Sequence, residues 1–147
     1  MSDLTFRQAT AADLPLLNRL YSEMDGKPPL SPEKIAQIWA DLQQLPHCHI
    51  YLASQGETAV GTFTLLVIPT MMHPGFHRSA LVDAVTVSPA HRSQGIGRAM
   101  MAYALELARE AGCYKLMLSS NLRRQRTHEF YRSLGFEQHG WSFSLTV

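Results

Sequence analysis

A strand-like run passes through a glycine-containing turn into the longest amphipathic pattern of the chain, and this junction restricts the fold more than any other feature. Residues 80–87 are mostly apolar and end at Ser88-Pro89. Residues 95–111 place apolar side chains at helical spacing, and Gly112 supplies a stop signal. A strand that leads directly into a long helix, among further strands and helices, predicts an α/β or α+β domain with a mixed sheet.

The segments on either side of this junction supply the other strands and helices. Before the junction we expect a strand from Leu4, then a helix that begins after Thr10, then a helix that begins at Pro32 and stops before Pro46. These are followed by an antiparallel hairpin of residues 48–53 and 59–68 and by a loop over residues 69–78. The order expected after it is a strand over 114–118, a helix over about 124–134 that ends at Gly135, and a closing strand in which Trp141, Phe143 and Leu145 alternate with polar residues. No repeat or linker interrupts this order, so we expect a single domain over residues 1–147.

Two of the expected helices carry capping signals at their starts. Thr10 is followed three residues later by Asp13, which is the pattern of a capping box. Ser31 precedes Pro32, and this pairs a preferred N-cap residue with a proline at the first helical position. These signals predict where the first two helices begin.

The composition is that of an ordinary globular protein and argues against several classes of function. The 147 residues are 46% hydrophobic and 17% charged, and the formal net charge of +1 favours neither a nucleic acid nor a membrane surface as partner. Cys48 and Cys113 are spaced neither as a disulfide framework nor as a metal-binding pair, and His47 and His49 lack a third ligand, so we expect reduced thiols and no metal. The N-terminus is charged where a signal peptide is apolar, and no apolar run approaches the ~20 residues of a membrane span. We therefore expect a cytoplasmic protein.

The turn over residues 92–99 has the features of a phosphate cradle. The start of a helix offers unpaired N–H groups and the positive end of a dipole, and Gly95 and Gly97 let a ligand approach that backbone closely. A P-loop is excluded because Gly97 is followed by Arg98 rather than Lys, and a Rossmann fingerprint because Met100 replaces its third small residue. An ordinary helix start with two turn glycines stays open as the alternative.

Three blocks of the sequence together resemble the GNAT N-acetyltransferases. Arg92-x-x-Gly95-x-Gly97 is similar to the Gln/Arg-x-x-Gly-x-Gly/Ala signature of that superfamily. Residues 85–89 look like its central strand, and Asn121 with residues 130–136 looks like its second conserved block. Thr127 departs from the pattern, in which Ala is frequent. The order of the elements also agrees, so the resemblance covers nearly the whole chain.

The resemblance implies a mixed, mostly antiparallel central sheet flanked by helices, and acetyl-CoA as the co-substrate. The pyrophosphate of coenzyme A would lie on the N–H groups of residues 93–98, and the pantetheine arm would run between the strands 80–87 and 114–119. The residues that the resemblance assigns to the coenzyme are Val85, Val87, Arg92, Ser93, Gln94, Gly95, Ile96, Gly97, Arg98 and Asn121.

Two residues are candidates for proton transfer. Tyr131 matches the family's general acid, which protonates the departing thiolate, and the alternative is that it only packs its helix on the sheet. Asp83 is the candidate base, because the two-residue period of a strand puts it on the same face as Val85 and Val87. An ionisable side chain in an apolar strand is costly unless it is used or paired, so a structural ion pair or a water-linked carboxylate is the alternative.

The implied reaction is transfer of an acetyl group to a primary amine by direct attack, with a small molecule as the expected acceptor. We expect the loop over residues 69–79 to form one wall of the acceptor pocket, lined by Met71, Met72 and Phe76. We also expect a homodimer, because relatives pair through sheet edges or C-terminal strands. A non-catalytic module that binds or senses coenzyme A, a protein or peptide N-acetyltransferase, and transfer of another acyl group are the alternatives. The sequence does not identify the acceptor amine.

Overall fold

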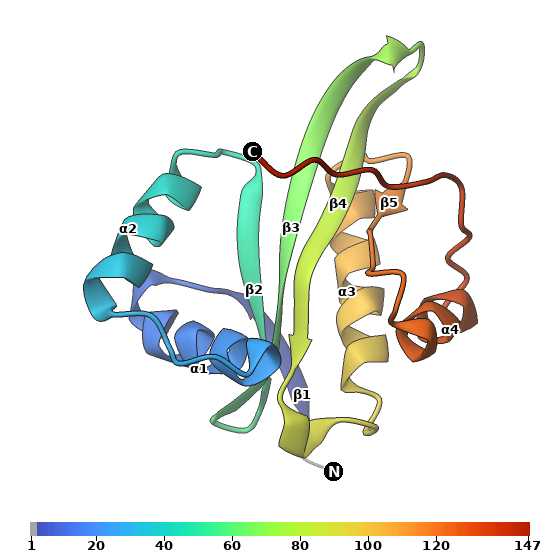
Figure 1. The fold of residues 1–147 in the computed structure, drawn as a ribbon. Coiled ribbons are helices and arrows are strands. Elements are labelled where there is room, and N and C mark those ends of the chain that lie inside the picture. Colours follow the sequence, from blue (N-terminus) through green and yellow to red (C-terminus); the bar gives the residue numbers. More distant parts are fainter. Residues whose placement is uncertain (1–2) are drawn as a thin grey trace. The chain divides into compact units, whose positions relative to one another are not determined.

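A computed structural model describes residues 3–147, which divide into two compact units, one that ends at Met117 and one that spans Leu118–Val147 (Figure 1). The first unit contains the sheet and the helices α1 to α3, and the second contains α4 (Gln125–Ser133). Within residues 3–147, every helix is too short or too polar to cross a membrane.

The first unit is built on one five-stranded sheet. Its neighbouring strands follow the order β1-β2-β3-β4-β5. The pairs from β1 to β4 are antiparallel, and β5 runs parallel to β4. The strands are β1 (Leu4–Gln8), β2 (Cys48–Gln55), β3 (Thr58–His73), β4 (Phe76–Val87) and β5 (Leu116–Met117). The prediction of a mixed, mostly antiparallel sheet flanked by helices is confirmed.

Helices cover both faces of this sheet (Figure 1). α1 and α2 lie on one face and α3 on the other; the bounds are α1 (Leu14–Asp25), α2 (Pro32–Gln43) and α3 (Ile96–Glu110). On the α3 face, the ring of Tyr103 lies 6.5 Å from that of Phe63. Met100 packs so closely on Gly61 that a Cβ at Gly61 would lie 2.7 Å from the methionine sulfur. A glycine at this point of β3 therefore lets α3 pack directly on the sheet.

The first two helices begin where the capping signals predict. A 3-10 turn at Ala11–Asp13 follows Thr10, whose N–H donates to the carboxylate of Asp13 at 2.8 Å, and α1 continues from Leu14. Ser31 caps α2 by accepting a hydrogen bond from the N–H of Lys34 at 3.2 Å. Both signals are local, and the structure confirms both.

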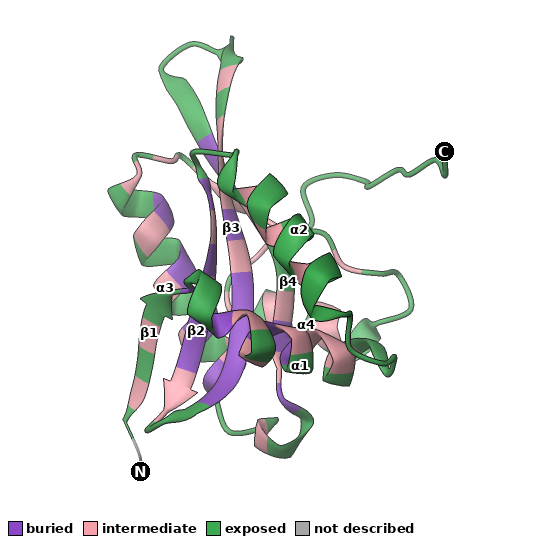
Figure 2. Cartoon of the chain, turned by 90° about the vertical axis from the view of Figure 1, so that its left-hand side faces the viewer, coloured by how far each residue is buried: buried purple, intermediate pink, exposed green. Residues whose placement is uncertain are grey.

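The prediction of a loop over residues 69–78 is wrong. β3 continues to His73 and β4 begins at Phe76, so the two strands form a long hairpin that turns at Pro74-Gly75. Gly75 has a φ of 83°, a conformation that side-chain-bearing residues rarely adopt. The central part of β3 is buried, whereas the end of the hairpin projects beyond the other strands and is exposed (Figure 2).

This hairpin does not provide the apolar pocket wall that we expected from its sequence. Met71 is fully exposed, Met72 is 79% exposed and Phe76 is 54% exposed. Met71 and Met72 extend into solvent, and the ring of Phe76 lies 5.1 Å from that of Tyr114, so the three side chains do not enclose a cavity. The prediction that they line the acceptor pocket is therefore wrong.

The second unit consists of α4, the turn before it and an extended C-terminal segment. α4 ends as predicted at Gly135, which has a φ of 90°, and the N–H of Phe136 donates to the carbonyl of Tyr131 at 3.1 Å. The predicted closing strand is wrong, because residues 137–147 form no strand. Trp141 and Phe143 are 75% and 91% exposed. An alternating pattern makes a strand only where a partner strand completes the hydrogen bonds.

Asp13 is a buried carboxylate that fixes the start of α1. Two nitrogens of Arg7 donate to its two oxygens at 2.7 Å, and the N–H of Thr10 donates at 2.8 Å. The side chain of Asp13 is only 7% exposed. The bonds from Arg7 are the main reason that the pKa of Asp13 falls to about 2, although burial acts in the opposite direction.

We expect the Asp13→Asn variant to lose about 1–3 kcal/mol of unfolding free energy at pH 7, because charge-assisted hydrogen bonds are lost. The folded pKa of Asp13 is lowered, so its contribution is present above about pH 4 and is lost as the pH falls towards 2. Urea unfolding at a series of pH values should therefore show the two proteins converging over that interval. The control is Glu23→Gln, which breaks the exposed Arg19–Glu23 pair and should change stability by less than about 0.5 kcal/mol. A difference that stays constant down to pH 2 would contradict this role of the ionised carboxylate.

Candidate active site

A turn with two left-handed residues joins β4 to α3. The chain first makes a 3-10 turn at Pro89–His91, and Ser93 and Gly95 then take φ values of 61° and 79°. Such conformations direct main-chain N–H groups into a concave site for an anion, and the start of α3 adds N–H groups without helical partners. A Cβ built on Gly95 meets no atom within 4 Å, so the backbone at Gly95 is open to a ligand.

Several side chains of this turn hold its own backbone in place. Arg92 Nε donates to the carbonyl of Val87 at 3.3 Å, and Gln94 Nε2 donates to the carbonyl of Ala90 at 3.5 Å. Ile96 is 2% exposed and anchors the first turn of α3 in the core. Arg92, Gln94 and Ile96 therefore fix the shape of the turn, a role that the sequence pattern did not separate from contact with a ligand.

The edge of β4 that faces β5 is only partly paired. β5 pairs with β4 at Ala80 and Leu81. Val82, Asp83, Thr86 and Val87 have register partners on β3, and none of residues 82–87, all of them within the described chain, has a partner on β5. Main-chain polar groups on this edge are therefore open to hydrogen bonds from another molecule. This stretch contains Val85 and Val87, where the sequence predicted contact with the pantetheine arm.

β4 contains one extra residue opposite Phe63. Thr62 pairs with Thr86 and Thr64 pairs with Asp83, so Ala84 and Val85 together oppose the single residue Phe63. Ala84 has a φ of 49°, in the left-handed region that costs an L-residue roughly 1–2 kcal/mol. A β-bulge of this kind changes the direction of the side chains that follow it.

Because of this bulge, the prediction that Asp83 shares a face with Val85 and Val87 is wrong. Residues opposite each other in a sheet share a face, and neighbours along a strand alternate. Asp83 is opposite Thr64, whereas Val87 is opposite Gly61, three residues away on β3 and therefore on the other face. Asp83 points to the face that carries α1 and α2, where it is exposed.

Tyr21 of α1 reaches this same face, and sequence reasoning missed it. Burial raises the pKa of Tyr21, hydrogen bonds with Thr62 and then Thr64 oppose that effect, and the charge of Asp83 raises it further. Thr62 Oγ1 donates its own proton to the carbonyl of Tyr51 at 2.8 Å, so its oxygen can accept from Tyr21. A neutral tyrosine hydroxyl therefore lies near the carboxylate of Asp83. In the sequence, Tyr21 is one member of an apolar helical line, and no signal distinguishes it.

The structure also bears on the alternative that Asp83 forms a structural ion pair. Among residues 3–147, the ion pairs found are Arg7–Asp13 and Arg19–Glu23. Asp83 is in neither pair, and its side chain is exposed. A structural ion pair therefore does not explain why a carboxylate occurs in this strand.

Tyr131 belongs to the second unit, where it packs among aromatic rings. The ring of Tyr131 lies 5.2 Å from that of Phe130 and 5.6 Å from that of Phe136. Burial raises the pKa of Tyr131, and the nearby positive charge of Arg124 acts in the opposite direction. The hydroxyl of Tyr131 therefore keeps its proton at neutral pH.

Asn121 shapes the turn that precedes α4. Its Oδ1 accepts a hydrogen bond from the N–H of Arg123 at 3.0 Å, and its carbonyl lies 2.9 Å from Nε2 of His128. A side-chain carbonyl that bonds the backbone two residues later is a frequent way to build a turn. The observed hydrogen bonds of Asn121 thus position the start of α4.

The cysteines and the other metal-binding residue types form no centre. Cys48 and Cys113 are both free, and burial raises the pKa of each thiol. Within the described chain, no three His, Cys, Asp or Glu side chains are grouped so that they could hold a metal ion.

Comparison with known proteins gives this arrangement a family. Residues 15–136 match the profile of the Acetyltransferase (GNAT) family, which is far more than half of the chain. The chain is 29% identical to the glucosamine 6-phosphate N-acetyltransferase of Trypanosoma brucei brucei, over 93% of this chain and 91% of that protein. It is 31% identical to the aminoalkylphosphonate N-acetyltransferase of Salmonella typhimurium, over 69% of this chain and 65% of that protein.

Solved structures agree with the sequence comparisons. A putative acetyltransferase from Agrobacterium tumefaciens has a TM-score of 0.90 and 30% identity to this chain, and the match covers 97% of this chain and 99% of that chain. The predicted resemblance is therefore confirmed over nearly the whole length. The chain belongs to the Acetyltransferase (GNAT) family, whose members use acetyl-CoA, and it is an N-acetyltransferase of that family.

Proposed function

We propose that this protein transfers the acetyl group of acetyl-CoA to the primary amine of a small molecule by direct attack. The observation that carries the proposal is the combination of an open anion-binding turn at Ser93 and Gly95 with an unpaired main-chain edge on the preceding strand. Two relatives bear names that specify small amines as acceptors, glucosamine 6-phosphate and an aminoalkylphosphonate. These names favour a small molecule over a peptide.

The proposed reaction is balanced without a metal or a redox partner. The neutral amine nitrogen forms a bond to the carbonyl carbon of the thioester, and the carbon–sulfur bond then breaks. The amine loses one proton, the departing thiolate gains one, and the products are an amide and free coenzyme A. The protein must therefore provide a proton acceptor near the amine, a proton donor near the sulfur, and a donor to the oxyanion.

The coenzyme is proposed to bind along the turn and the strand that precedes it. Its pyrophosphate lies on the N–H groups of residues 93–98, with Arg92, Gln94 and Ile96 holding the turn. Its pantetheine arm bonds the open edge of β4 near Val85 and Val87. Asn121 contributes by fixing the turn before α4.

Asp83 is proposed as the proton acceptor and Tyr131 as the proton donor. Asp83 is exposed and belongs to no ion pair within the described residues, so its carboxylate is free to take a proton directly or through water. The raised pKa of Tyr131 keeps a proton on its hydroxyl, as a general acid requires. The bulge at Ala84 gives Asp83 its direction, towards the face that carries α1 and α2.

We propose one domain over residues 1–147 and a homodimer in solution. The family match continues across residue 117, where the two units meet in the sequence, and this supports a single domain. The exposed apolar side chains of Trp141, Phe143 and Leu145 favour coverage by a second copy. A cytoplasmic location stays a prediction from the sequence.

The conformation of the turn predicts that a bulky substitution at Gly95 prevents binding of the coenzyme. Gly95→Val should abolish acetyl-CoA binding measured by calorimetry, because a branched side chain occupies the open side of the cradle and resists a φ of 79°. Gly112→Val is the matched control, since Gly112 has a φ of 73° at the other end of α3 and carries the same backbone strain. A folded Gly95→Val protein with unchanged affinity would overturn the cradle assignment.

The activity itself is tested by release of free thiol from acetyl-CoA with a panel of small amines. In this assay Tyr131→Phe should lower the turnover roughly 10²–10⁴-fold, the usual range for a general acid, with little change in acetyl-CoA affinity. Tight acetyl-CoA binding without thiol release by the wild type, for any amine, would instead favour a coenzyme-binding module. Wild-type turnover in the variant would make Tyr131 a packing residue.

Asp83→Asn should show a pH dependence that distinguishes a base from a structural residue. Near neutral pH the acceptor amine is mostly protonated, so loss of the proton acceptor should strongly depress the rate. The rate should recover as the pH rises and free amine accumulates. Rates measured from pH 7 to 10 for the variant and the wild type give the comparison. A flat profile close to that of the wild type would transfer the role to a chain of water molecules.

A further inference from the structure

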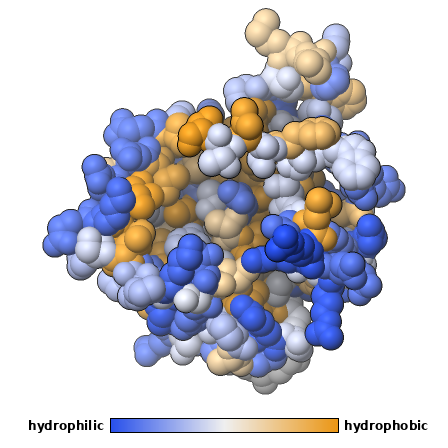
Figure 3. All heavy atoms as spheres, viewed as in Figure 1, coloured by the Kyte–Doolittle hydropathy of each residue, from blue (hydrophilic) through white to orange (hydrophobic). Residues whose placement is uncertain are grey.

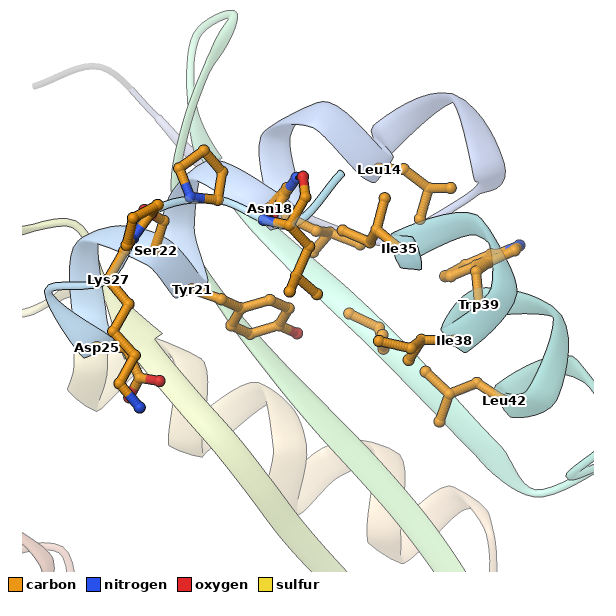
Figure 4. A pocket seen from close by; sticks show the side chains of 15 residues that line it. Leu14, Asn18, Tyr21, Ser22, Asp25, Lys27, Ile35, Ile38, Trp39 and Leu42 are labelled. Carbon is orange, nitrogen blue, oxygen red and sulfur yellow. Dashed lines mark hydrogen bonds between the residues drawn. The ribbon is translucent and has the colours of Figure 1, made fainter. Parts of the chain in front are cut away.

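Helices α1 and α2, the segment between them and Ile50 of β2 line a mostly apolar, partly open cavity of about 270 Å³. Figure 4 shows its two ends: Ile35, Ile38, Trp39 and Leu42 form an apolar end, Asp25 and Lys27 lie at the other, and Tyr21 projects between them. Figure 3 shows hydrophobic residues gathered between α2 and the sheet. A dry cavity of about 150 Å³ holds benzene, so this one has room for a ring or a branched alkyl group with a short linker.

The cavity lies on the same face of the sheet as Asp83. Ile50 of β2 lines the cavity and is directly opposite Thr64 of β3, which in turn is directly opposite Asp83 of β4. These three residues form a row across one face, and neighbouring strands lie about 4.8 Å apart. Asp83 is therefore two strand spacings from the cavity floor at Ile50, about 10 Å.

Tyr21 connects the cavity with the carboxylate. It lines the cavity, and its hydroxyl bonds Thr62 and Thr64 on the strand between Ile50 and Asp83. A ligand in the cavity thus meets the ring of Tyr21 along its body and the polar row at its end. A molecule of about 10 Å that is apolar at one end and carries an amine at the other fits this arrangement.

The outer wall of the cavity is held in place before any ligand binds. Asn18 of α1 both donates to the carbonyl of Leu30 at 2.8 Å and accepts from its N–H at 2.9 Å. Ser22, one turn further along α1, donates to the carbonyl of Lys27. Pro28 and Pro29 stiffen the segment between these two anchors. A preformed wall lowers the ordering cost of binding, which is typical of small-molecule sites.

We propose that this cavity binds the apolar group of the acceptor, so that the substrate is a primary amine with an aromatic or branched alkyl group three to five bonds from its nitrogen. The inference rests on the proposed function, because it puts the amine at Asp83. The apolar end of the lining gives the polar groups of a sugar phosphate or phosphonate no partners for the hydrogen bonds that they would lose on leaving water. Selectivity thus comes from burial of apolar area between α1 and α2.

The first experiment compares matched amines with the full-length protein. Thiol release from acetyl-CoA is measured with 2-phenylethylamine and 4-phenylbutylamine against ethanolamine, 2-aminoethylphosphonate and glucosamine 6-phosphate. We expect kcat/KM for an aryl amine to exceed that for each polar amine by roughly tenfold or more, because an aromatic ring is buried. Equal or better rates with the polar amines would overturn the inference and leave the proposed function intact.

The second experiment fills the cavity and uses a matched control. Leu30 lines the cavity and is 46% exposed, whereas Leu45 is 49% exposed and lies outside the lining. Leu30→Trp should raise KM for 2-phenylethylamine about tenfold and leave both the KM for ethanolamine and acetyl-CoA affinity unchanged. Leu45→Trp should change none of them. If Leu30→Trp changed KM equally for both amines, or for neither, the assignment of the cavity to the apolar group of the acceptor would be contradicted.

A binding measurement separates this inference from the proposed function. Trp39 lines the cavity, and Trp141→Phe leaves it as the single tryptophan of the chain. With coenzyme A present, 2-phenylethylamine should quench Trp39 emission in a saturable manner, and ethanolamine should not. Saturable quenching without thiol release would support the cavity and refute the enzymatic proposal. Thiol release without saturable quenching would refute the assignment of the cavity and support the enzymatic proposal.

Discussion

The pairing of β3 with β4 is the constraint on which the rest of the site depends. On one face of β3, Gly61 and Phe63 receive α3, and on the other, Thr62 and Thr64 face α1. Because β3 is buried on both faces in its centre, its register cannot shift without moving apolar side chains into contact with polar ones. The extra residue at Ala84 interrupts the register in this central part of the pairing, and it decides which face Asp83 meets.

The same strand leads directly into the turn that starts α3. Arg92 reaches back to the carbonyl of Val87, so the end of β4 and the turn are held as one piece. Burial of Ile96 then fixes where the helix begins. The open edge of β4 and the N–H groups of the turn are thus parts of a continuous stretch of backbone. A long ligand with a phosphate at one end and an amide-containing arm could bond both without any rearrangement of the fold.

Features that depend on neighbouring residues could be predicted from the sequence, and features that depend on distant partners could not. The capping box at Thr10, the cap at Ser31 and the stop at Gly135 are local, and all three were predicted correctly. The extension of the hairpin past Pro69 and the missing closing strand depend on whether a partner strand is available, which alternation of residue types does not reveal.

The residues of the candidate site also divide into those that the sequence predicts and those that it does not. The glycine turn was predictable because its conformation needs particular residue types at fixed spacing. The direction of Asp83 was not, because a single inserted residue reverses the two-residue period, and an alanine in a strand gives no sign that it will take a positive φ. Tyr21 was missed for a different reason: its hydroxyl gains a role only through Thr62 and Thr64, which are more than forty residues away on another element.

These observations suggest why one fold can serve different acceptors. The anion-binding turn and the open edge of β4 act through main-chain groups, which stay the same when side chains change. The cavity between α1 and α2 is lined instead by side chains such as Ile38 and Leu42, which belong to a helix that packs on the sheet and is not hydrogen-bonded into it. Substitutions there would alter the shape and polarity of the proposed acceptor site without disturbing the β3–β4 register. In the proposed mechanism, selection of the amine and activation of the thioester are carried by separate parts of the structure, which meet at the row of residues that ends in Asp83.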